Sequence, residues 1–337
     1  MRALEVTDER TLTEAELDDP SPGPGEVLIE VAYCGICGSD LHMLPSPAIA
    51  PGTVMGHEFS GRIAALGDGV EGWSEGDRVA VIPMDPCREC PNCLAGQEHL
   101  CMQAPVRGHG LGGRPGAYAE RVSAPATSLV ALPDAISDEH GALVEPLAVG
   151  VHAVALSDAD SADPAVVLGA GPIGVMTALA ARAAGHERLV VIEPGERRRE
   201  RITALGFDAV PLEGAHEAII ERLGGELPAV VWECAGHPDA LGLGLELVRG
   251  AGTVVAVGVL EEPVPLNQLL LILKEARILG AFAYRREDFE AAVELIEGGR
   301  VPAEELITDV APLGRAQELF DELRRPGTEQ LKVLLKP

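Results

Sequence analysis

The sequence has few lysines, few aromatic residues and no long apolar segment. Its only lysines are Lys274, Lys332 and Lys336, and aromatic residues make up 3% of the 337 residues. No apolar run approaches the roughly 20 residues of a membrane-spanning helix, and the charged N-terminal stretch lacks the apolar core of a signal peptide. We therefore expect a cytoplasmic protein that is not embedded in a membrane. The scarcity of aromatic side chains gives no indication of an aromatic-lined pocket.

Basic residues are also scarce relative to acidic ones. The 53 acidic and 26 basic residues give a net charge of −27, which repels the phosphate backbone of nucleic acids. Hydrophobic residues at 47% and charged residues at 23% are typical of a globular protein, and the length suits about two domains. The composition therefore predicts a globular protein with neither a nucleic acid nor a membrane as its partner.

Short strand patterns separated by turn residues characterise the first part of the chain. A Pro-Gly-Pro-Gly turn at 22–25 precedes the apolar stretch 26–33, and further strand-like stretches follow at 58–66 and 78–82. No long helical period occurs before about residue 138. This pattern predicts a mostly β domain.

The pattern changes near residue 148, where apolar runs begin to alternate with helical segments. Such alternation predicts a parallel, doubly wound sheet, so the expected fold class is α/β. Residues 282–337 then hold two amphipathic helices and a final strand. The expected strands are 165–168, 188–192, 230–232 and 253–257, and the expected helices include 172–184, 196–205, 286–298 and 314–323.

A glycine-rich turn follows the first of these strands and opens the first helix. It matches the pattern Gly-x-Gly-x-x-Gly in the context that the pattern requires, between a strand and a helix. Its glycines allow a pyrophosphate to approach closely, and the helix N-terminus offers free N–H groups and the positive end of the helix dipole. The turn therefore predicts a dinucleotide site formed by Gly169, Gly171, Pro172, Ile173 and Gly174.

The residues after the second strand bear on the choice of cofactor. Glu193 lies 19 residues after Gly174, where an acidic side chain can bind the adenosine ribose of NAD and repel a 2′-phosphate. Arg197, Arg198 and Arg199 follow in the next helical turn, and an arginine such as Arg198 could accommodate the 2′-phosphate of NADP. We expect NAD, with NADP as the alternative.

Six of the seven cysteines lie between residues 34 and 101, which in a chain of this size indicates metal binding. Four of them have the spacing C-x2-C-x2-C-x7-C. Four thiolates can enclose a zinc ion tetrahedrally and leave no open position for a substrate, so this site is expected to be structural. An iron–sulfur cluster or two disulfides are the alternatives. The four residues are Cys87, Cys90, Cys93 and Cys101.

A second, dispersed set of ligand-type residues surrounds Cys37 and His57, each of which is flanked by glycine. A catalytic zinc takes three protein ligands of Cys, His or Glu type and keeps one open position. A redox pair of Cys34 and Cys37 is an alternative, but no thioredoxin-like pattern surrounds it. The spacing leaves the third ligand open among Asp40, His42, Glu58 and Glu145.

Taken together, these motifs resemble those of the zinc-dependent medium-chain alcohol dehydrogenases. They are Cys-Gly-Ile-Cys-Gly-Ser-Asp-x-His at 34–42, Gly-His-Glu at 56–58, the four-cysteine segment and the glycine motif, in this order. The chain is most similar to the polyol, threonine and butanediol dehydrogenase branch, because Glu145, in Glu-Pro-Leu-Ala-Val, stands where that branch places a glutamate. The resemblance covers nearly the whole chain and implies a mostly β, GroES-like catalytic domain together with a dinucleotide-binding Rossmann domain.

The resemblance also implies which residues bind the catalytic zinc. Cys37, His57 and Glu145 would be its ligands, and Glu58 would be a neighbouring or exchangeable ligand. Asp40 would orient the ring of His57, because outer partners of this kind fix the tautomer of a ligating histidine.

Proton transfer and cofactor contacts follow from the same resemblance. Ser39 would take the proton of the alcohol and pass it through the cofactor ribose to His42. Lys332 matches a C-terminal basic position that approaches the pyrophosphate, whereas a solvated lysine at a strand end is the alternative interpretation. Gly38 stands where some relatives carry a phosphate-binding arginine.

The expected organisation is a catalytic domain formed by residues 1–147 and 282–337, with the structural zinc lobe at about 85–102. The Rossmann domain is expected at 148–281. The resemblance further implies a homodimer or homotetramer joined through the parallel sheet.

The function predicted is zinc-dependent transfer of a hydride between a secondary alcohol or small polyol and NAD, which gives a ketone or an aldehyde. One alternative is an NADP-linked aldehyde or ketone reductase on the same scaffold. A zinc- and nucleotide-binding protein without turnover and a zinc-ribbon interaction module are alternatives of other classes.

Overall fold

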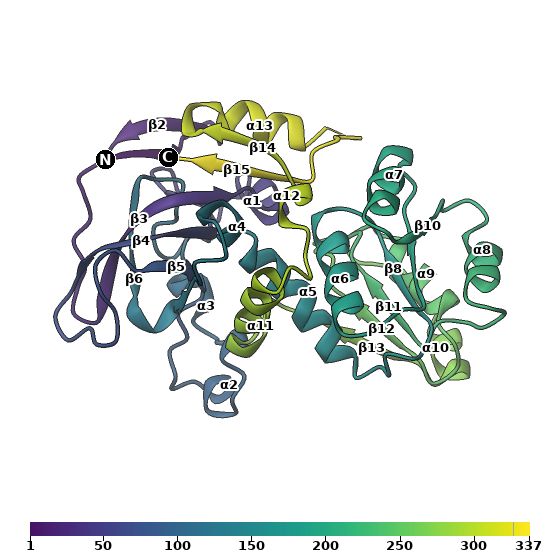
Figure 1. Cartoon of the computed structure of the whole chain (residues 1–337). Coiled ribbons are helices and arrows are strands. Elements are labelled where there is room, and N and C mark those ends of the chain that lie inside the picture. Colours follow the sequence, from purple (N-terminus) through teal and green to yellow (C-terminus); the bar gives the residue numbers. More distant parts are fainter. Residues whose placement is uncertain (326) are drawn as a thin grey trace. The chain divides into compact units, whose positions relative to one another are not determined.

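A computed structural model describes residues 1–325 and 327–337 of the chain. The chain forms two compact units (Figure 1). Unit 1 consists of Met1–Glu145 and Arg285–Pro337, and unit 2 consists of Pro146–Tyr284. None of the helices in the described ranges is long and apolar enough to cross a bilayer.

Unit 1 is built on a seven-stranded sheet with the order β14-β15-β3-β4-β5-β7, in which β6 also pairs with β3. The alternation of apolar residues along β3 buries Val27, Ile29 and Val31 in one hydrophobic core. A separate hairpin joins β1 and β2. The strands of unit 1 are β1 (Arg2–Val6), β2 (Leu12–Glu16), β3 (Glu26–Gly35), β4 (Glu58–Leu66), β5 (Arg78–Val81), β6 (Arg121–Pro125), β7 (Leu129–Ala131), β14 (Ile307–Pro312) and β15 (Lys332–Lys336).

Most helices of unit 1 are short. The longest that lies wholly within the unit, α11, buries Phe289, Ala292, Val293 and Ile296, which recur at the spacing of one helix face. The helices are α1 (Gly38–Met43), α2 (Pro91–Leu94), α3 (Ala104–Arg107), α4 (Asp138–Gly141), α11 (Arg286–Glu297), α12 (Ala303–Leu306) and α13 (Ala316–Leu323), with 3-10 turns η1 (Glu98–Leu100), η2 (Ala126–Ser128) and η3 (Leu313–Arg315). The boundary with unit 2 falls within α5 (Val144–Ser157).

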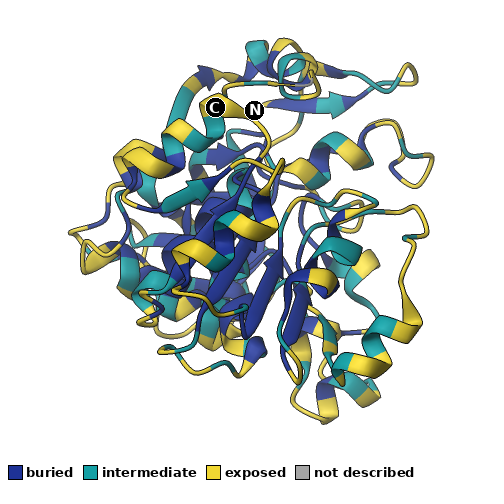
Figure 2. Ribbon diagram, turned by 90° about the vertical axis from the view of Figure 1, so that its right-hand side faces the viewer, coloured by how far each residue is buried: buried dark blue, intermediate teal, exposed yellow. Residues whose placement is uncertain are grey.

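Unit 2 contains a six-stranded sheet with the order β10-β9-β8-β11-β12-β13, and all its neighbouring strands are parallel. Strands β8, β9 and β11 are short apolar runs buried along their whole length, as the dark blue strands in Figure 2 show. The predicted α/β fold with a second, mostly β domain is therefore confirmed.

Helices separate the successive strands of unit 2, which is the connection that parallel strands require. The chain order reverses at β8, which lies between β9 and β11 in the sheet. In sheets of this kind, ligands bind beyond the carboxyl ends of the strands at such a point. The elements are β8 (Ala165–Leu168), α6 (Pro172–Ala183), β9 (Leu189–Ile192), α7 (Glu196–Ala204), β10 (Asp208–Val210), α8 (Ala215–Arg222), β11 (Val230–Glu233), α9 (Ala240–Leu247), β12 (Thr253–Ala256), α10 (Gln268–Lys274) and β13 (Arg277–Gly280).

Candidate active site

Sheet register brings Cys37 and His57 together although 19 residues separate them in the sequence. Strands β3 and β4 are antiparallel, and Gly35 at the end of β3 pairs with Glu58 at the start of β4. Cys37 therefore lies just beyond one strand and His57 just before the other, at the same edge of the sheet. Strand β15 pairs with the other side of β3, and Ile36 N donates to Val333 O over 2.9 Å.

The ligand atoms of Cys37, His57 and Glu58 form a compact group in which all lie within 4.8 Å of one another. His57 and Glu58 are buried, and Glu58 Oε1 has no hydrogen-bond partner among the described residues. A buried carboxylate oxygen without a partner is costly unless a cation or donor reaches it. A thiolate, an imidazole and a carboxylate are the ligand types that zinc takes, so this group fits a zinc ion.

Asp40 connects the two predicted ligands of this group. Its side chain is fully buried, and its Oδ1 lies 3.3 Å from Nδ1 of His57. Its Oδ2 accepts a hydrogen bond from the backbone N–H of Cys37 over 3.0 Å. The imidazole Nε2, on the other side of the ring, lies 3.4 Å from Ser39 Oγ. The ring therefore has one nitrogen toward Asp40 and the other toward Ser39.

The charges of this cluster favour a cation. Burial lowers the pKa of His57, but Asp40 and Cys37 outweigh it and raise that pKa well above its usual value. Burial, followed by the charge of Glu58, raises the pKa of the Cys37 thiol. A cluster that holds extra protons in this way can release them when a metal ion takes their place.

Glu145 lies outside the group of ligand atoms formed by Cys37, His57 and Glu58. It is buried in the first turn of α5, and its charge contributes to raising the pKa of Lys332. The structure thus brings Glu58, not Glu145, to Cys37 and His57. The assignment of Glu145 as third ligand, which the resemblance implied, stays a prediction.

Lys332 lies beside the candidate zinc site. Its ammonium is buried, donates to Glu58 Oε2 over 2.6 Å and to Ile36 O over 3.2 Å, and so is not a solvated lysine. The contact with a pyrophosphate that the resemblance implied for Lys332 stays a prediction. The alternative interpretation, a solvated lysine, is wrong because β15 pairs with the end of β3 and places the Lys332 side chain among buried residues.

The four predicted lobe cysteines converge on one point. Their sulfur atoms lie within 4.8 Å of one another, and all seven cysteines of the chain are free. The N–H groups of Cys87 and Gln103 donate to Cys101 Sγ over 3.3 and 3.4 Å. Hydrogen bonds from the backbone of Cys93 and Met102 lower the pKa of Cys90 to about 6, which favours a thiolate. The lobe therefore fits a second zinc ion with no open position.

The glycine motif lies between β8 and α6, as the sequence predicts. Gly171 is the N-cap of α6 and Pro172 its first residue, so free N–H groups of this helix end face the turn. A Cβ atom on Gly174 would lie 1.9 Å from the carbonyl oxygen of Gly169, so this position requires glycine. Gly169 and Gly171 line a pocket of about 880 Å³ within unit 2.

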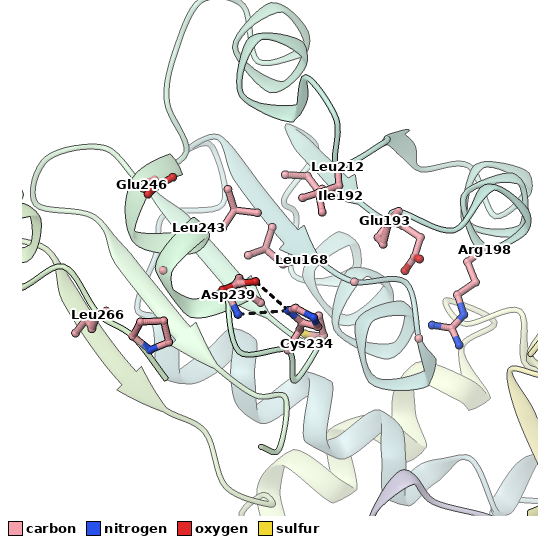
Figure 3. A pocket seen from close by; sticks show the side chains of 18 of the residues that line it. Leu168, Ile192, Glu193, Arg198, Leu212, Cys234, Asp239, Leu243, Glu246 and Leu266 are labelled. Atoms are coloured by element: carbon pink, nitrogen blue, oxygen red, sulfur yellow. Dashed lines mark hydrogen bonds and ion pairs between the residues drawn. The ribbon is translucent and has the colours of Figure 1, made fainter. Parts of the chain in front are cut away.

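Glu193 and Arg198 line the same pocket and lie next to each other at one side of it (Figure 3). The carboxylate of Glu193 accepts hydrogen bonds from the N–H of Ala170 over 2.7 Å and of Gly195 over 2.8 Å. Glu193 therefore ties the second strand to the glycine turn and closes that side of the pocket with negative charge. Ile173, also predicted at the cofactor, follows Pro172 in the first turn of α6 but does not line this pocket.

Comparisons with known proteins agree with these two sites. Residues 23–134 match the model of the alcohol dehydrogenase GroES-like domain, and residues 172–298 match that of the zinc-binding dehydrogenases. The chain belongs to the zinc-dependent medium-chain alcohol dehydrogenase family. It is thus a zinc-dependent oxidoreductase of the CH–OH group, and the family predicted from the motifs is confirmed.

Three relatives illustrate the breadth of this dehydrogenase family. A 2-dehydro-3-deoxy-L-galactonate 5-dehydrogenase of Pseudoalteromonas atlantica is 36% identical, over 89% of this chain and 88% of its own. A sorbitol dehydrogenase of Halalkalibacterium halodurans is 33% identical, over 100% and 99%. The crystal structure of 2R,3R-butanediol dehydrogenase from Bacillus subtilis matches with a TM-score of 0.91 and 32% identity, over 100% and 99%.

Sequence reasoning missed Tyr118, which the structure places in the site. Its side chain is fully buried, and its hydroxyl donates to Asp40 Oδ2 over 2.6 Å. Tyr118 lies in no motif and 78 residues from Asp40, so no local signal in the sequence pointed to this contact.

Proposed function

We propose that this dehydrogenase oxidises a secondary alcohol group of a small polyol or a related sugar derivative, with NAD as the hydride acceptor. The alcohol loses a hydride to NAD⁺ and a proton to the protein, and the products are a ketone, NADH and a proton. The observation that carries this proposal is the buried group of Cys37, His57 and Glu58 with Ser39 beside it. The printed names of the three relatives support the substrate class, since each acts on a diol, a polyol or a sugar acid.

Cys37 and His57 would hold the zinc ion, with Glu58 or, as the resemblance implies, Glu145 as the third ligand. Asp40 would keep the ring of His57 turned toward the ion. Bound zinc would supply a Lewis acid for the alcohol oxygen, and NAD would supply the hydride acceptor. Ser39 Oγ, near His57 Nε2, would accept the proton of the substrate hydroxyl. His42 lies three residues later on the same helix and is exposed, so it can release that proton to water.

NAD is the proposed cofactor because of Glu193. Its buried carboxylate lies at the pocket wall beside the glycine turn, where it can accept from ribose hydroxyls and repel a 2′-phosphate. Arg198, on the same side of the pocket, favours the second candidate, an NADP-linked reductase of aldehydes or ketones. The carboxylate outweighs the arginine in this proposal because its place is fixed by two backbone hydrogen bonds.

Initial rates test the proposal. A panel of vicinal diols, sugar alcohols, sugar acids and simple secondary alcohols is offered with NAD and, separately, with NADP, before and after treatment with a zinc chelator. The expected result is NADH formation with one of these groups that the chelator abolishes. Turnover that survives complete zinc removal, or turnover with NADP alone, would contradict the proposal.

We also propose that the chain forms a homodimer, or a homotetramer built from such dimers, through the outer edge of the parallel sheet. Strand β13 has a neighbour, β12, on one side only, and an unpaired strand edge can pair with that of a second copy. The segment around this strand also exposes large apolar side chains, which are Val259, Leu266, Leu269, Ile272, Leu273 and Phe282.

A further inference from the structure

We infer that Tyr118 is a positioning residue that holds Asp40, and through it both Cys37 and His57, in the geometry that binds the catalytic zinc. This inference rests on the zinc site proposed above. The hydroxyl of Tyr118 donates to Asp40 Oδ2 over 2.6 Å, and both side chains are fully buried. A buried hydrogen bond from a hydroxyl to a carboxylate is short and roughly twice as strong as one between neutral groups.

Asp40 connects Tyr118 to both predicted zinc ligands, because one of its oxygens contacts Cys37 and the other lies near His57. Oδ2 also accepts the backbone N–H of Cys37 over 3.0 Å, whereas Oδ1 lies 3.3 Å from Nδ1 of His57. The terminal torsion of an aspartate is soft, so a single amide holds the carboxylate plane weakly. The hydroxyl of Tyr118 supplies a second donor to the same oxygen, which keeps Oδ1 turned toward the imidazole.

The ring of Tyr118 is itself fixed. It packs edge-on against Phe320 of α13, with ring centroids 6.1 Å apart. It also lies so close to Gly56 that a Cβ atom there would be 2.5 Å from the tyrosine Cδ1. Gly56 has a φ of +98° and directly precedes His57, so the ring contacts the backbone turn that presents this ligand.

Tyr118→Phe tests the hydroxyl apart from the ring, because it removes the hydroxyl while the phenylalanine ring keeps the packing on Phe320 and Gly56. Zinc release from the full-length enzyme into an excess of a chromogenic chelator is the readout, together with kcat and KM. Removing an outer partner of a metal ligand typically costs about 10–100-fold in metal affinity or activity. We expect zinc to leave the Cys37 site about tenfold faster in Tyr118→Phe.

Two further variants make this experiment specific. Cys37→Ala identifies the phase of zinc release that belongs to the catalytic site, because that phase is missing in this variant. Tyr284→Phe removes the hydroxyl of a tyrosine that is likewise buried but lies in unit 2, and it should leave this phase unchanged. A change confined to Tyr118→Phe is a local effect on the metal and not a general loss of stability.

A double-mutant cycle tests the route through Asp40. If Tyr118 acts through this carboxylate, adding Tyr118→Phe to Asp40→Ala, which removes the acceptor of the tyrosine hydroxyl, should accelerate zinc release no further. Unchanged release in Tyr118→Phe, with the Cys37 phase present, would overturn the inference and leave the proposed function intact. Full additivity of the two substitutions would also overturn it. Absence of any Cys37-dependent zinc would instead overturn the proposed zinc site, and the positioning role with it.

Discussion

Glu58 and Lys332 show how a residue acquires its role from partners that are distant in the sequence. Glu58 Oε2 accepts from the ammonium of Lys332 over 2.6 Å, while its Oε1 has no hydrogen-bond partner among the described residues. Breaking a buried ion pair is strongly destabilising because it leaves an uncompensated charge. Lys332 therefore offsets the charge of Glu58 and engages one of its two carboxylate oxygens.

Single residues of the site were predictable where a short motif carried them. Cys37, His57 and the four lobe cysteines stand out by residue type and spacing, and the structure brings each set together. The contacts of Tyr118 and Lys332 with the site were not predictable in this way. They depend on long-range contacts that join residues 78 and 274 positions apart, which no local pattern encodes.

Substitution of the single residue Glu193 should change the use of the cofactor. Replacing it with alanine removes a charged acceptor of ribose hydroxyls, and hydrogen bonds to charged groups contribute about 1.5–3 kcal/mol. We expect kcat/KM with NAD to fall roughly 10–100-fold and the preference for NAD over NADP to decrease. Steady-state kinetics with both cofactors measure this. The matched variant Arg198→Ala should impair NADP far more than NAD, whereas equal loss with both cofactors in Glu193→Ala would contradict the assignment.

Among the strands and helices, those with a clear pattern of apolar residues were predictable from the sequence. The runs that form β8 and β11 are fully buried, and the strand expected at 165–168 is found as β8 (Ala165–Leu168). Helix α5 (Val144–Ser157) was not predicted as an element. It is buried nearly all round at its start, so it lacks the helical period of a half-exposed helix.

We expect the four-cysteine lobe to be held by its metal site rather than by a core. It exposes Leu94 and Met102 to solvent, and its helices α2 and η1 have only four and three residues. Helices of this length are not stable on their own. We therefore expect a zinc ion bound by the four cysteines to be the main constraint on the conformation of the lobe.

Loss of one lobe cysteine should destabilise the protein. Cys90→Ser should remove the zinc ion of the lobe and lower Tm by roughly 5–10 °C, as expected for a loss of a few kcal/mol in a domain of this size. Differential scanning calorimetry measures the shift, and limited proteolysis should show new cleavage between residues 86 and 103. Cys34→Ser, at a buried cysteine outside the lobe, serves as the control for proteolysis. Unchanged proteolysis and Tm in Cys90→Ser would contradict a structural zinc.

At the level of the whole molecule, the chain divides into one unit with the candidate metal sites and another with the pocket beside the glycine motif. The alternation of strands and helices was sufficient to predict this division of fold types. The surface for assembly was less predictable, because the sequence of an apolar segment such as α10 does not show whether its side chains are buried in the core or exposed. Leu273 is 72% exposed and Ile272 is 61% exposed.

The proposed dimer predicts a change in mass. Ile272→Glu combined with Leu273→Glu introduces like charges at the outer edge of unit 2 and should convert the wild-type oligomer to a smaller species. Size-exclusion chromatography with light scattering measures the mass of each. Leu94→Glu, at a position 75% exposed in unit 1, should leave the mass unchanged. A monomeric wild-type chain would contradict the proposal, and so would a double variant of unchanged mass.

The central claim is that the group around Cys37 and His57 holds the zinc ion on which turnover depends. Zinc content and alcohol oxidation, measured together for wild type, Cys37→Ala and Cys90→Ser, test it most directly. The wild type should hold about two zinc ions per chain and each variant about one, in keeping with the two ligand groups. Turnover should disappear in Cys37→Ala and persist in the folded fraction of Cys90→Ser. A Cys37→Ala variant that still holds about two zinc ions, or that still oxidises the alcohol, would contradict the account.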